Sequence, residues 1–409
     1  METLRRKLFT ELSNHLEERE FTIITGARQT GKTTLLRQLE EELKSENKKV
    51  YYLSLEDPEI LANLNRHPDN IFKYLTLDTN CITYLLMDEI QYLDDPSNFL
   101  KLLYDNYSSN FKLVVTGSSA FYIDKKFTDS LAGRKRLFKL YTLDFNEFIY
   151  FKTGSSDLIN ELSEIRNTEK YLSLKRRELK FLFKEYLTFG GYPGVVLAKD
   201  ETKKKLLLKD LFLSYLQKDI YESKIRDENK FYELLIILAN QTGSLLNMNE
   251  LSNTLKISVT AVENYIYILQ KSFHIQLIKP FHKNIRKELT KMPKIYFNDL
   301  GFRTTILNTY QDIETRLDKG EVIENYAYIR LREKYEMDYI KFWRTTSGNE
   351  VDFIIDDPGL SSKNAFEIKF NNTSYNMTKY KKFTEAYPDY SLQLRSYLAE
   401  NNYTDIMAL

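Results

Sequence analysis

The chain has 409 residues, a hydrophobic fraction of 42% and a formal net charge of +1 at pH 7. This length favours two or three domains. No apolar run reaches the roughly 18–20 residues that span a membrane, and the first residues lack a secretory signal. The single cysteine, Cys81, excludes a disulfide framework and a multi-cysteine zinc site. We therefore expect a cytoplasmic protein with no membrane attachment, on which any basic surface is local.

Residues 26–33, GARQTGKT, fit the phosphate-loop pattern G-x4-G-K-[ST]. A β-branched run, Phe21–Thr25, precedes them, and residues 34–43 have apolar positions at helical spacing. Strand, glycine loop and helix is the arrangement that phosphate binding requires, and it disfavours the alternative of an ordinary glycine turn. We therefore predict that ATP is bound by Gly26, Ala27, Arg28, Gln29, Thr30, Gly31, Lys32, Thr33 and Thr34.

The chemistry of such a loop assigns roles to these residues. Backbone N–H groups converge on phosphate at the helix N-terminus. Lys32 reaches the β- and γ-phosphates, and Thr33 places its hydroxyl on Mg²⁺. The second motif is an apolar strand, residues 82–87, that ends in Asp88 and Glu89. We expect Asp88 to hold Mg²⁺ and Glu89 to activate the attacking water; the alternative is a pair of acids that cap the next helix.

A further strand-like run, Val50–Leu55, separates the two motifs, which is typical of the additional-strand class of P-loop ATPases. Residues 112–117 and 137–143 predict a fourth and a fifth strand, and Ser118 at the end of the fourth is placed to sense the γ-phosphate. Arg134 and Arg136 are candidates for a finger on the nucleotide of a neighbouring subunit. The equally weighted alternative is a solvated basic loop.

Seven segments carry a resemblance to a known family: GARQTGKTT (26–34), LLMDEIQ (85–91), TGSSA (116–120), LAGR (131–134), LDFNEF (143–148), GGYP (190–193) and the C-terminal FWRTTSGNEVDFII with FEIKF. With these, the chain resembles prokaryotic AAA+ ATPases that carry a C-terminal domain of unknown function. The resemblance implies an α/β protein with an AAA+ P-loop core (1–150), a helical lid (151–235), a winged helix-turn-helix (236–305) and a restriction-endonuclease-like PD-(D/E)XK domain (306–409).

The middle of the chain reads as helices interrupted by Gly190–Gly194, either a hinge or a lid turn near the nucleotide. Residues 246–255 and 259–273 have a helix-turn-helix pattern with Ser258 as N-cap. A basic hairpin follows, in which we expect DNA phosphates to contact Lys283, Arg286, Lys287 and Lys291. The second helix offers no Arg or Lys for base edges, and a packing or protein-interaction module is the alternative.

The C-terminal residues carry a D…E-x-K pattern. We expect strands at 340–344, 350–355 and 365–369 to bring Asp352, Glu367 and Lys369 together, and we expect Glu324 on a helix at 321–333. Two carboxylates of such a site bind Mg²⁺, the lysine positions or activates water, and Glu324 adds a ligand or a hydrogen bond. The alternatives are a solvated strand and a domain that keeps the fold without cleaving.

Together these features predict an ATP-hydrolysing AAA+ protein that acts on DNA as a motor or clamp, with branched DNA and Mg²⁺-dependent cleavage as further options. ATP and Mg²⁺ are the expected cofactors, and a homo-oligomer is the expected assembly. The rival hypothesis is a nucleotide-operated switch that binds a protein partner and carries an inactive nuclease-like docking domain.

Overall fold

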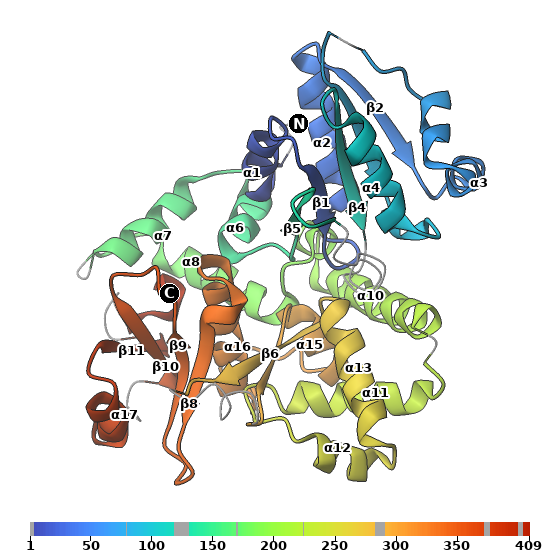
Figure 1. The fold of residues 1–409 in the computed structure, drawn as a ribbon. Helices are drawn as coiled ribbons and strands as arrows, with labels where there is room; N and C mark the ends of the chain where they lie inside the picture. The colour runs from blue at the N-terminus through green and yellow to red at the C-terminus, as the bar shows by residue number, and fades with distance from the viewer. Residues whose placement is uncertain are drawn as a thin grey trace. The chain divides into compact units, whose positions relative to one another are not determined.

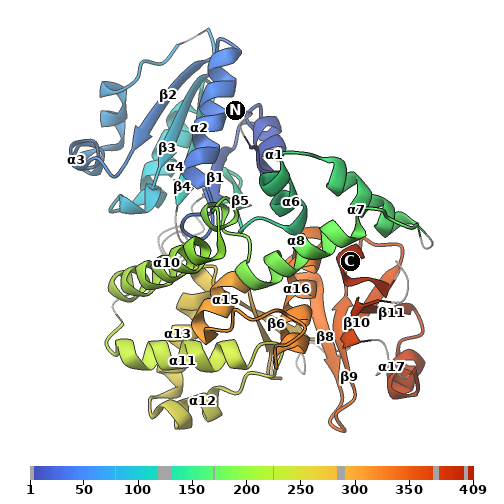
Figure 2. The same cartoon turned by 180° about the vertical axis from the view of Figure 1, so that it is seen from behind.

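The computed structural model describes residues 4–78, 80–117, 131–168, 171–223, 225–282, 291–371, 377–399 and 404–409. It divides into two units, each drawn in Figures 1 and 2. Unit 1 comprises Met1–Thr142 with Lys271–Phe273, and unit 2 comprises Leu143–Gln270 with His274–Leu409. No helix in these ranges combines the length and the hydropathy that a membrane crossing requires.

A parallel sheet of five strands, in the order β2-β3-β4-β1-β5, organises unit 1 (its strands are labelled in Figure 2). The strands are β1 (Phe21–Thr25), β2 (Lys49–Ser54), β3 (Thr83–Asp88), β4 (Phe111–Gly117) and β5 (Lys135–Lys139). Strand β4 lies between β1 and β3, so the strand that carries the phosphate loop and the strand that carries the acids are not neighbours. This order is the additional-strand arrangement that the sequence predicts.

The two faces of this sheet are covered by different helices, α1 (Leu8–His15), α2 (Lys32–Ser45), α3 (Pro58–Arg66) and α4 (Pro96–Tyr107). Alternate strand residues point to opposite faces. Ile24 and Leu86 therefore pack with α1 and α2, whereas Ile23 and Leu85 pack with α3 and α4. The sheet is buried on both faces, as is usual for parallel sheets, and its functional groups gather at the carboxyl ends of the strands.

Strand β5 differs from the sequence prediction. The apolar residues suggest a strand at 137–143, but β5 spans Lys135–Lys139 and pairs with β1 from Phe21↔Lys135 to Thr25↔Lys139. It is an edge strand with mostly exposed side chains. An edge strand of this kind is defined by its backbone pairing rather than by an apolar run, so the hydrophobic pattern places it too far along the chain.

Unit 2 begins with helices and ends with a mixed sheet. Its helices are α6 (Phe145–Thr153), α7 (Asp157–Asn167), α8 (Arg176–Phe189), α9 (Pro193–Val196), α10 (Glu201–Glu222), α11 (Glu228–Asn240), α12 (Met248–Leu255), α13 (Val259–Lys271), α15 (Leu300–Leu307), α16 (Lys319–Lys334) and α17 (Lys381–Ala386). Its strands are β6 (Ile275–Pro280), β7 (Lys294–Phe297), β8 (Ile340–Arg344), β9 (Glu350–Ile355), β10 (Lys363–Asn371) and β11 (Tyr390–Leu398).

The six strands form one sheet in the order β11-β10-β9-β8-β6-β7. Figure 2 labels β11, β10, β9, β8 and β6 of this sheet. Strands β8, β9 and β10 are antiparallel neighbours, whereas β11 runs parallel to β10 and β6 runs parallel to β8. Because β6 pairs with β8, the segments expected at 236–305 and 306–409 share a sheet. The division of unit 2 at residues 235 and 305 stays a prediction.

The helix-turn-helix pattern appears as α12 and α13. The Ser258 hydroxyl accepts a hydrogen bond from the Ala261 N–H (3.1 Å), which confirms its capping role. Lys256, in the turn, has φ of 55°, the left-handed conformation that ends α12. The antiparallel pair β6–β7 follows α13.

Candidate nucleotide site and C-terminal carboxylate cluster

The phosphate loop joins β1 to α2, and its backbone explains its glycines. Gly31 has φ of 96° at the N-cap of α2, a conformation that side chains disfavour. At Gly26, a Cβ atom would collide with the carbonyl group of Leu140. Arg6 supports the loop by donating hydrogen bonds to the carbonyl oxygens of Thr30 (2.8 Å) and Tyr141 (2.9 Å). The loop is therefore held by unit 1 around it and not by its own residues alone.

Lys32 lies folded into this loop. Its Nζ donates hydrogen bonds to the carbonyl oxygens of Gly26 and Ala27, each at 2.9 Å, and the residue is buried. Burial lowers the pKa of Lys32 to about 8, and the charge of Glu89 opposes this shift. An ammonium held by backbone carbonyls in a buried loop is placed to exchange them for phosphate oxygens.

Asp88 is the centre of a hydrogen-bonded group at the carboxyl end of β3. Its Oδ2 accepts hydrogen bonds from the hydroxyls of Thr33 (2.7 Å) and Tyr52 (3.1 Å), and its Oδ1 accepts one from the hydroxyl of Thr116. The predicted pair of Mg²⁺ ligands, Thr33 and Asp88, is thus brought into direct contact. A hydroxyl and a carboxylate are oxygen donors of the kind that Mg²⁺ prefers, so these residues fit the ion.

Glu89 has an unusual backbone conformation. Its φ of 62° lies in the left-handed region that non-glycine residues rarely adopt. Its N–H donates to Thr116 Oγ1 (3.1 Å), and its carboxylate accepts a hydrogen bond from the Gln91 side chain. Residues held in such conformations cluster at functional sites. The alternative that these acids cap the next helix is wrong, because Asp95 caps α4 through the Asn98 N–H (3.0 Å).

Two residues of this site were missed by the sequence reasoning, Tyr52 and Thr116. Tyr52 lies in β2 and Thr116 in β4, the two neighbours of the acid strand β3. The sequence does contain a signal for such residues, namely a polar side chain near the carboxyl end of a strand that is predicted to be buried. The sequence could not say which strands flank β3, and that order decides which side chains reach Asp88.

The other predicted residues of unit 1 have different surroundings. Ser118 lies outside the described residues. Arg134 forms an ion pair with Asp105, with 2.7 Å between Nε and Oδ1, and the guanidinium of Arg136 lies 5.3 Å from the ring centre of Phe138. Both arginines therefore have partners within unit 1, and their role on a neighbouring subunit stays a prediction.

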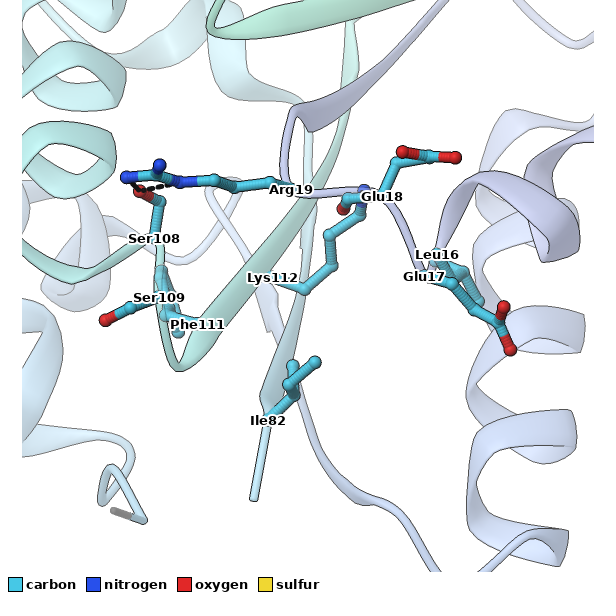
Figure 3. A pocket seen from close by; sticks show the side chains of 9 residues that line it. All are labelled: Leu16, Glu17, Glu18, Arg19, Ile82, Ser108, Ser109, Phe111 and Lys112. Atoms are coloured by element: carbon cyan, nitrogen blue, oxygen red, sulfur yellow. Dashed lines mark hydrogen bonds between the residues drawn. The ribbon is translucent and has the colours of Figure 1, made fainter. Parts of the chain in front are cut away.

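A pocket of ≈ 220 Å³ opens beside the amino ends of β3 and β4, at the other end of the strands from Asp88 (Figure 3). Arg19 crosses it and donates to Ser108 Oγ from Nε (3.2 Å) and Nη2 (3.1 Å). Lys112 points to the loop before β1 and donates to the carbonyl oxygens of His15 and Glu18, both at 2.7 Å. These basic groups fasten the loop to the sheet, and the pocket lies away from the strand ends that carry Asp88.

The predicted C-terminal residues also come together. Asp352 in β9 and Glu367 in β10 lie on neighbouring strands, and Lys369 Nζ lies 4.0 Å from Asp352 Oδ2 and donates a hydrogen bond to Glu367. Asp352 Oδ2 accepts a hydrogen bond from the backbone N–H of Ile368 (2.8 Å). Burial raises the pKa of Glu367 to about 7; Asp352 adds to the shift and Lys369 opposes it.

Lys294, the first residue of β7, was not singled out from the sequence. Its Nζ lies 3.0 Å from Glu324 Oε1, 2.5 Å from Glu350 Oε1 and 3.6 Å from Asp352 Oδ1, and its side chain is only 1% exposed. The acids Glu324, Glu350, Asp352 and Glu367, together with Lys294 and Lys369, are named here the carboxylate cluster. A lysine ammonium therefore lies where the acidic pattern alone suggests a metal ion.

The cluster in this arrangement does not fit Mg²⁺. Across the described ranges, no three or more His, Cys, Asp or Glu side chains are grouped so as to hold a metal ion. Mg²⁺ requires several oxygen ligands at about 2.0–2.1 Å, whereas the Glu324 oxygen Oε1 is bonded to Lys294 and to the Tyr296 hydroxyl (2.6 Å). We derive no cleavage step through this cluster.

Of the predicted basic hairpin, only Lys291 is described; Lys283, Arg286 and Lys287 lie outside the described residues. Lys291 is exposed and lines a groove of ≈ 640 Å³ together with Lys279 and Lys341. Lys341 is paired with Asp356 (3.0 Å). Asp338 also lines this groove, so its lining contains both basic and acidic side chains.

Family comparisons agree with the nucleotide geometry. Residues 18–149 match the model of the AAA domain. The match supports an AAA-type ATPase. Residues 180–312 and 319–407 match two domains of unknown function, DUF8612 and DUF4143, and neither description names a nuclease or a winged helix. The restriction-endonuclease-like character of the C-terminal segment stays a prediction.

Relatives that match most of this chain occur in an archaeon and in bacteria. An uncharacterised protein of Methanocaldococcus jannaschii is 27% identical over 340 residues, 81% of this chain and 71% of the relative. One of Haemophilus influenzae is 27% identical over 363 residues, 85% and 83% of the two chains. One of Mycobacterium tuberculosis is 23% identical over 372 residues, 90% and 74%. The similarity extends well beyond the AAA segment.

Solved structures give weaker similarities. The replication initiator DnaA bound to AMPPCP and single-stranded DNA is 15% identical with a TM-score of 0.32, and the match covers 66% of this chain and 90% of that one. The Pif1 helicase from Candida albicans is 16% identical with a TM-score of 0.27, over 40% and 44% of the two chains. At these scores we draw no inference about function from either structure.

Proposed function

We propose that the chain binds ATP with Mg²⁺ at the phosphate loop and hydrolyses it. The observation that carries this proposal is the contact between Thr33 and Asp88, beside a Lys32 that is held inside the loop. In this proposal the backbone of residues 26–34 surrounds the phosphates, and Lys32 binds the β- and γ-phosphates. The AAA match of residues 18–149 supports it.

Each polar group of the site has a part in this chemistry. Thr33 and Asp88 hold Mg²⁺, which when bound neutralises charge on the β- and γ-phosphates. Glu89 orients the attacking water and accepts its proton. Thr116 fixes both acids, because its hydroxyl donates to Asp88 and accepts from the Glu89 N–H. Ser118, Arg134 and Arg136 are proposed to act on the γ-phosphate, the arginines from a neighbouring subunit of a homo-oligomer.

We propose DNA as the partner on which the ATP cycle acts. The exposed Lys291 and Lys279, which line the groove beside β6, support this proposal, and Lys283, Arg286 and Lys287 belong to the same basic segment of the sequence. Such contacts bind phosphates with little sequence preference and weaken with salt.

A second candidate function is a nucleotide-operated switch that binds a protein partner. The position of Lys294 favours it, because a carboxylate cluster whose acids are paired with a buried lysine has no evident cleavage chemistry. In the switch, ATP binding changes partner affinity, and DNA has no effect on hydrolysis.

The test measures ATP hydrolysis alone and with single-stranded, duplex and four-way junction DNA. We expect Lys32→Ala to reduce hydrolysis by about 100-fold or more, because the charge that stabilises the transferring phosphate is lost. Lys44→Ala is the matched control, since Lys44 lies on the same helix but is exposed and paired with Glu40. Normal turnover in Lys32→Ala would disprove the phosphate-loop assignment.

The DNA part of the proposal has its own readout. We expect DNA to increase the rate of the unaltered protein, and Lys279→Ala/Lys291→Ala to reduce this stimulation while the rate without DNA is kept. A rate that no DNA changes, but that a protein partner does change, would favour the switch.

A further inference from the structure

The carboxylate cluster brings many charged side chains of unit 2 into contact with one another. Four acids from α16, β9 and β10, namely Glu324, Glu350, Asp352 and Glu367, surround two lysines from β7 and β10. Arg344 adds a third cation at the rim, 2.9 Å from Glu350 Oε2. Acids that gather this closely repel one another unless cations lie between them.

Lys294 is the buried cation of this group. Its Nζ lies 3.0 Å from Glu324 Oε1, 2.5 Å from Glu350 Oε1 and 3.6 Å from Asp352 Oδ1, and its side chain is only 1% exposed. The backbone of Lys294 is fixed by strand pairing, because β7 pairs with β6 at Ile278↔Lys294. Lys294 therefore contacts three carboxylates from a backbone position that strand pairing fixes.

Three neighbouring residues complete the enclosure of the cluster. The Tyr296 hydroxyl donates to the same Glu324 oxygen that Lys294 contacts (2.6 Å), and at Gly243 a Cβ atom would lie 3.1 Å from that oxygen. On the far side, the Tyr380 hydroxyl donates to Glu367 Oε1 (2.6 Å), while Glu367 Oε2 is buried with no hydrogen-bond partner in the described part of the chain. Glu324 and Glu367 are thus each held in place by a tyrosine hydroxyl.

We propose that Lys294 is a built-in counter-ion which occupies the place of a divalent cation in the carboxylate cluster, so that the native chain binds no metal there. An ammonium can donate three hydrogen bonds and here faces three carboxylates. It offsets part of their negative charge without the short, near-octahedral coordination that Mg²⁺ demands. The C-terminal part of unit 2 is then a binding or structural module. The acids of its D…E-x-K pattern serve as ion-pair partners of lysine rather than as metal ligands.

The proposal predicts that a metal site appears when the lysine is removed. The test titrates Mn²⁺ into the full chain without nucleotide, with bound Mn²⁺ counted by electron paramagnetic resonance. Every protein in the series carries Asp88→Ala, so that the nucleotide site does not contribute. We expect Lys294→Met to bind one Mn²⁺ more than this parent does. The affinity of the new site should be at least about tenfold higher than that of any residual Mn²⁺ binding to the cluster in the parent. Adding Asp352→Asn should abolish that binding.

Two further variants keep the test decisive. Lys294→Arg retains the cation and should bind no Mn²⁺ at the cluster. Lys294→Met/Glu350→Gln removes one acid together with the lysine, which leaves the charge balance of the cluster unchanged and still provides Glu324, Asp352 and Glu367. If Lys294→Met does not fold by near-ultraviolet circular dichroism, this double variant should bind the Mn²⁺ in its place.

Two results would overturn the proposal. One is Mn²⁺ binding by the parent that Asp352→Asn removes, because the native lysine would then not exclude the metal; this titration stands whatever the variants do. The other is a folded Lys294→Met, or a folded double variant, that gains no site. Neither result bears on ATP hydrolysis, which is tested separately through Lys32.

Discussion

At the scale of single residues, Thr116 connects the two acids of the nucleotide site. Its hydroxyl donates to Asp88 and accepts from the N–H of Glu89, the residue with φ of 62°. Hydrogen-bonding partners of this kind orient the groups that contact metal and water. Thr116 is accordingly a positioning residue, and its loss should alter turnover more than binding.

We predict that Thr116→Val lowers the rate of ATP hydrolysis by about 10–100-fold while ATP affinity changes little, because the phosphate loop itself is untouched. Thr116→Ser retains the hydroxyl and should restore most of the rate. Thr83→Val is a matched control: Thr83 lies in β3, and its buried hydroxyl has no partner in the described residues. The measurement is steady-state hydrolysis with separate nucleotide titrations. A Thr116→Val protein with unchanged turnover would exclude the positioning role.

The same scale shows which parts of the site sequence alone can predict. Lys32, Thr33 and the glycines lie within one continuous motif, so their proximity follows from local chain geometry. Asp88 and Glu89 are recognisable because an apolar strand ends in two acids. Tyr52, Thr116 and Lys294 reach their partners only through strand pairing. Short motifs contain no information about that pairing.

At the scale of elements, the Gly190–Gly191 turn joins α8 to α9 and rests on the N-terminus of α15. Gly190 has φ of 70°, and a Cβ atom at either glycine would collide, at Gly190 with Asp299 and at Gly191 with the backbone of Leu143. Asp299 caps α15 by accepting from the Phe302 N–H (2.9 Å) and also accepts from the Gly191 N–H (2.8 Å). The turn is therefore tightly packed against Leu143 and the N-terminus of α15.

We predict that Asp299→Ala destabilises unit 2 by about 1–3 kcal/mol, because the helix loses its cap and a buried N–H loses its acceptor. Asp227→Ala is the matched control. Asp227 caps α11 through the Lys230 N–H (3.0 Å) in an exposed position, so its loss should cost less. Denaturant unfolding of both variants gives the comparison. Equal losses in the two variants would show that the bond to Gly191 contributes nothing.

Element prediction succeeded or failed for identifiable physical reasons. Strands β8 and β9 match their predicted bounds, 340–344 and 350–355, since apolar and polar residues alternate along them. Helix α16 begins and ends within a few residues of the prediction. The prediction placed β5 too far along the chain, because its exposed side chains do not alternate between apolar and polar. Pairing of β6 with β8 joins residues far apart in the sequence, and periodicity does not encode it.

At the scale of the whole molecule, the two units have separate sheets and largely separate cores. Domains with their own cores commonly unfold as their own cooperative units. A ligand that binds one of them stabilises that one by RT ln(1 + [L]/Kd). Nucleotide binding should therefore affect the two units unequally.

We predict two thermal transitions, of which only one shifts when MgATP, or an analogue that resists hydrolysis, is added. At a nucleotide concentration of 100 times Kd, the stabilisation should be about 2.7 kcal/mol. The shifted transition should become insensitive to nucleotide in Lys32→Ala. Differential scanning calorimetry provides the measurement, and equal shifts in both transitions would disprove independent unfolding.

The core of unit 2 has a consequence for the order in which the chain folds. It combines Leu143 and Phe145 with Ile406 and Met407, and its sheet begins only at Ile275 and ends at Leu398. As the ribosome extends the chain from its N-terminus, the strands of unit 1 are complete by Lys139, whereas the helices of unit 2 emerge long before their partners. Pairings over such separations form slowly and leave strand edges exposed. The core of unit 2 can therefore be completed only after residues as late as Met407 have been synthesised.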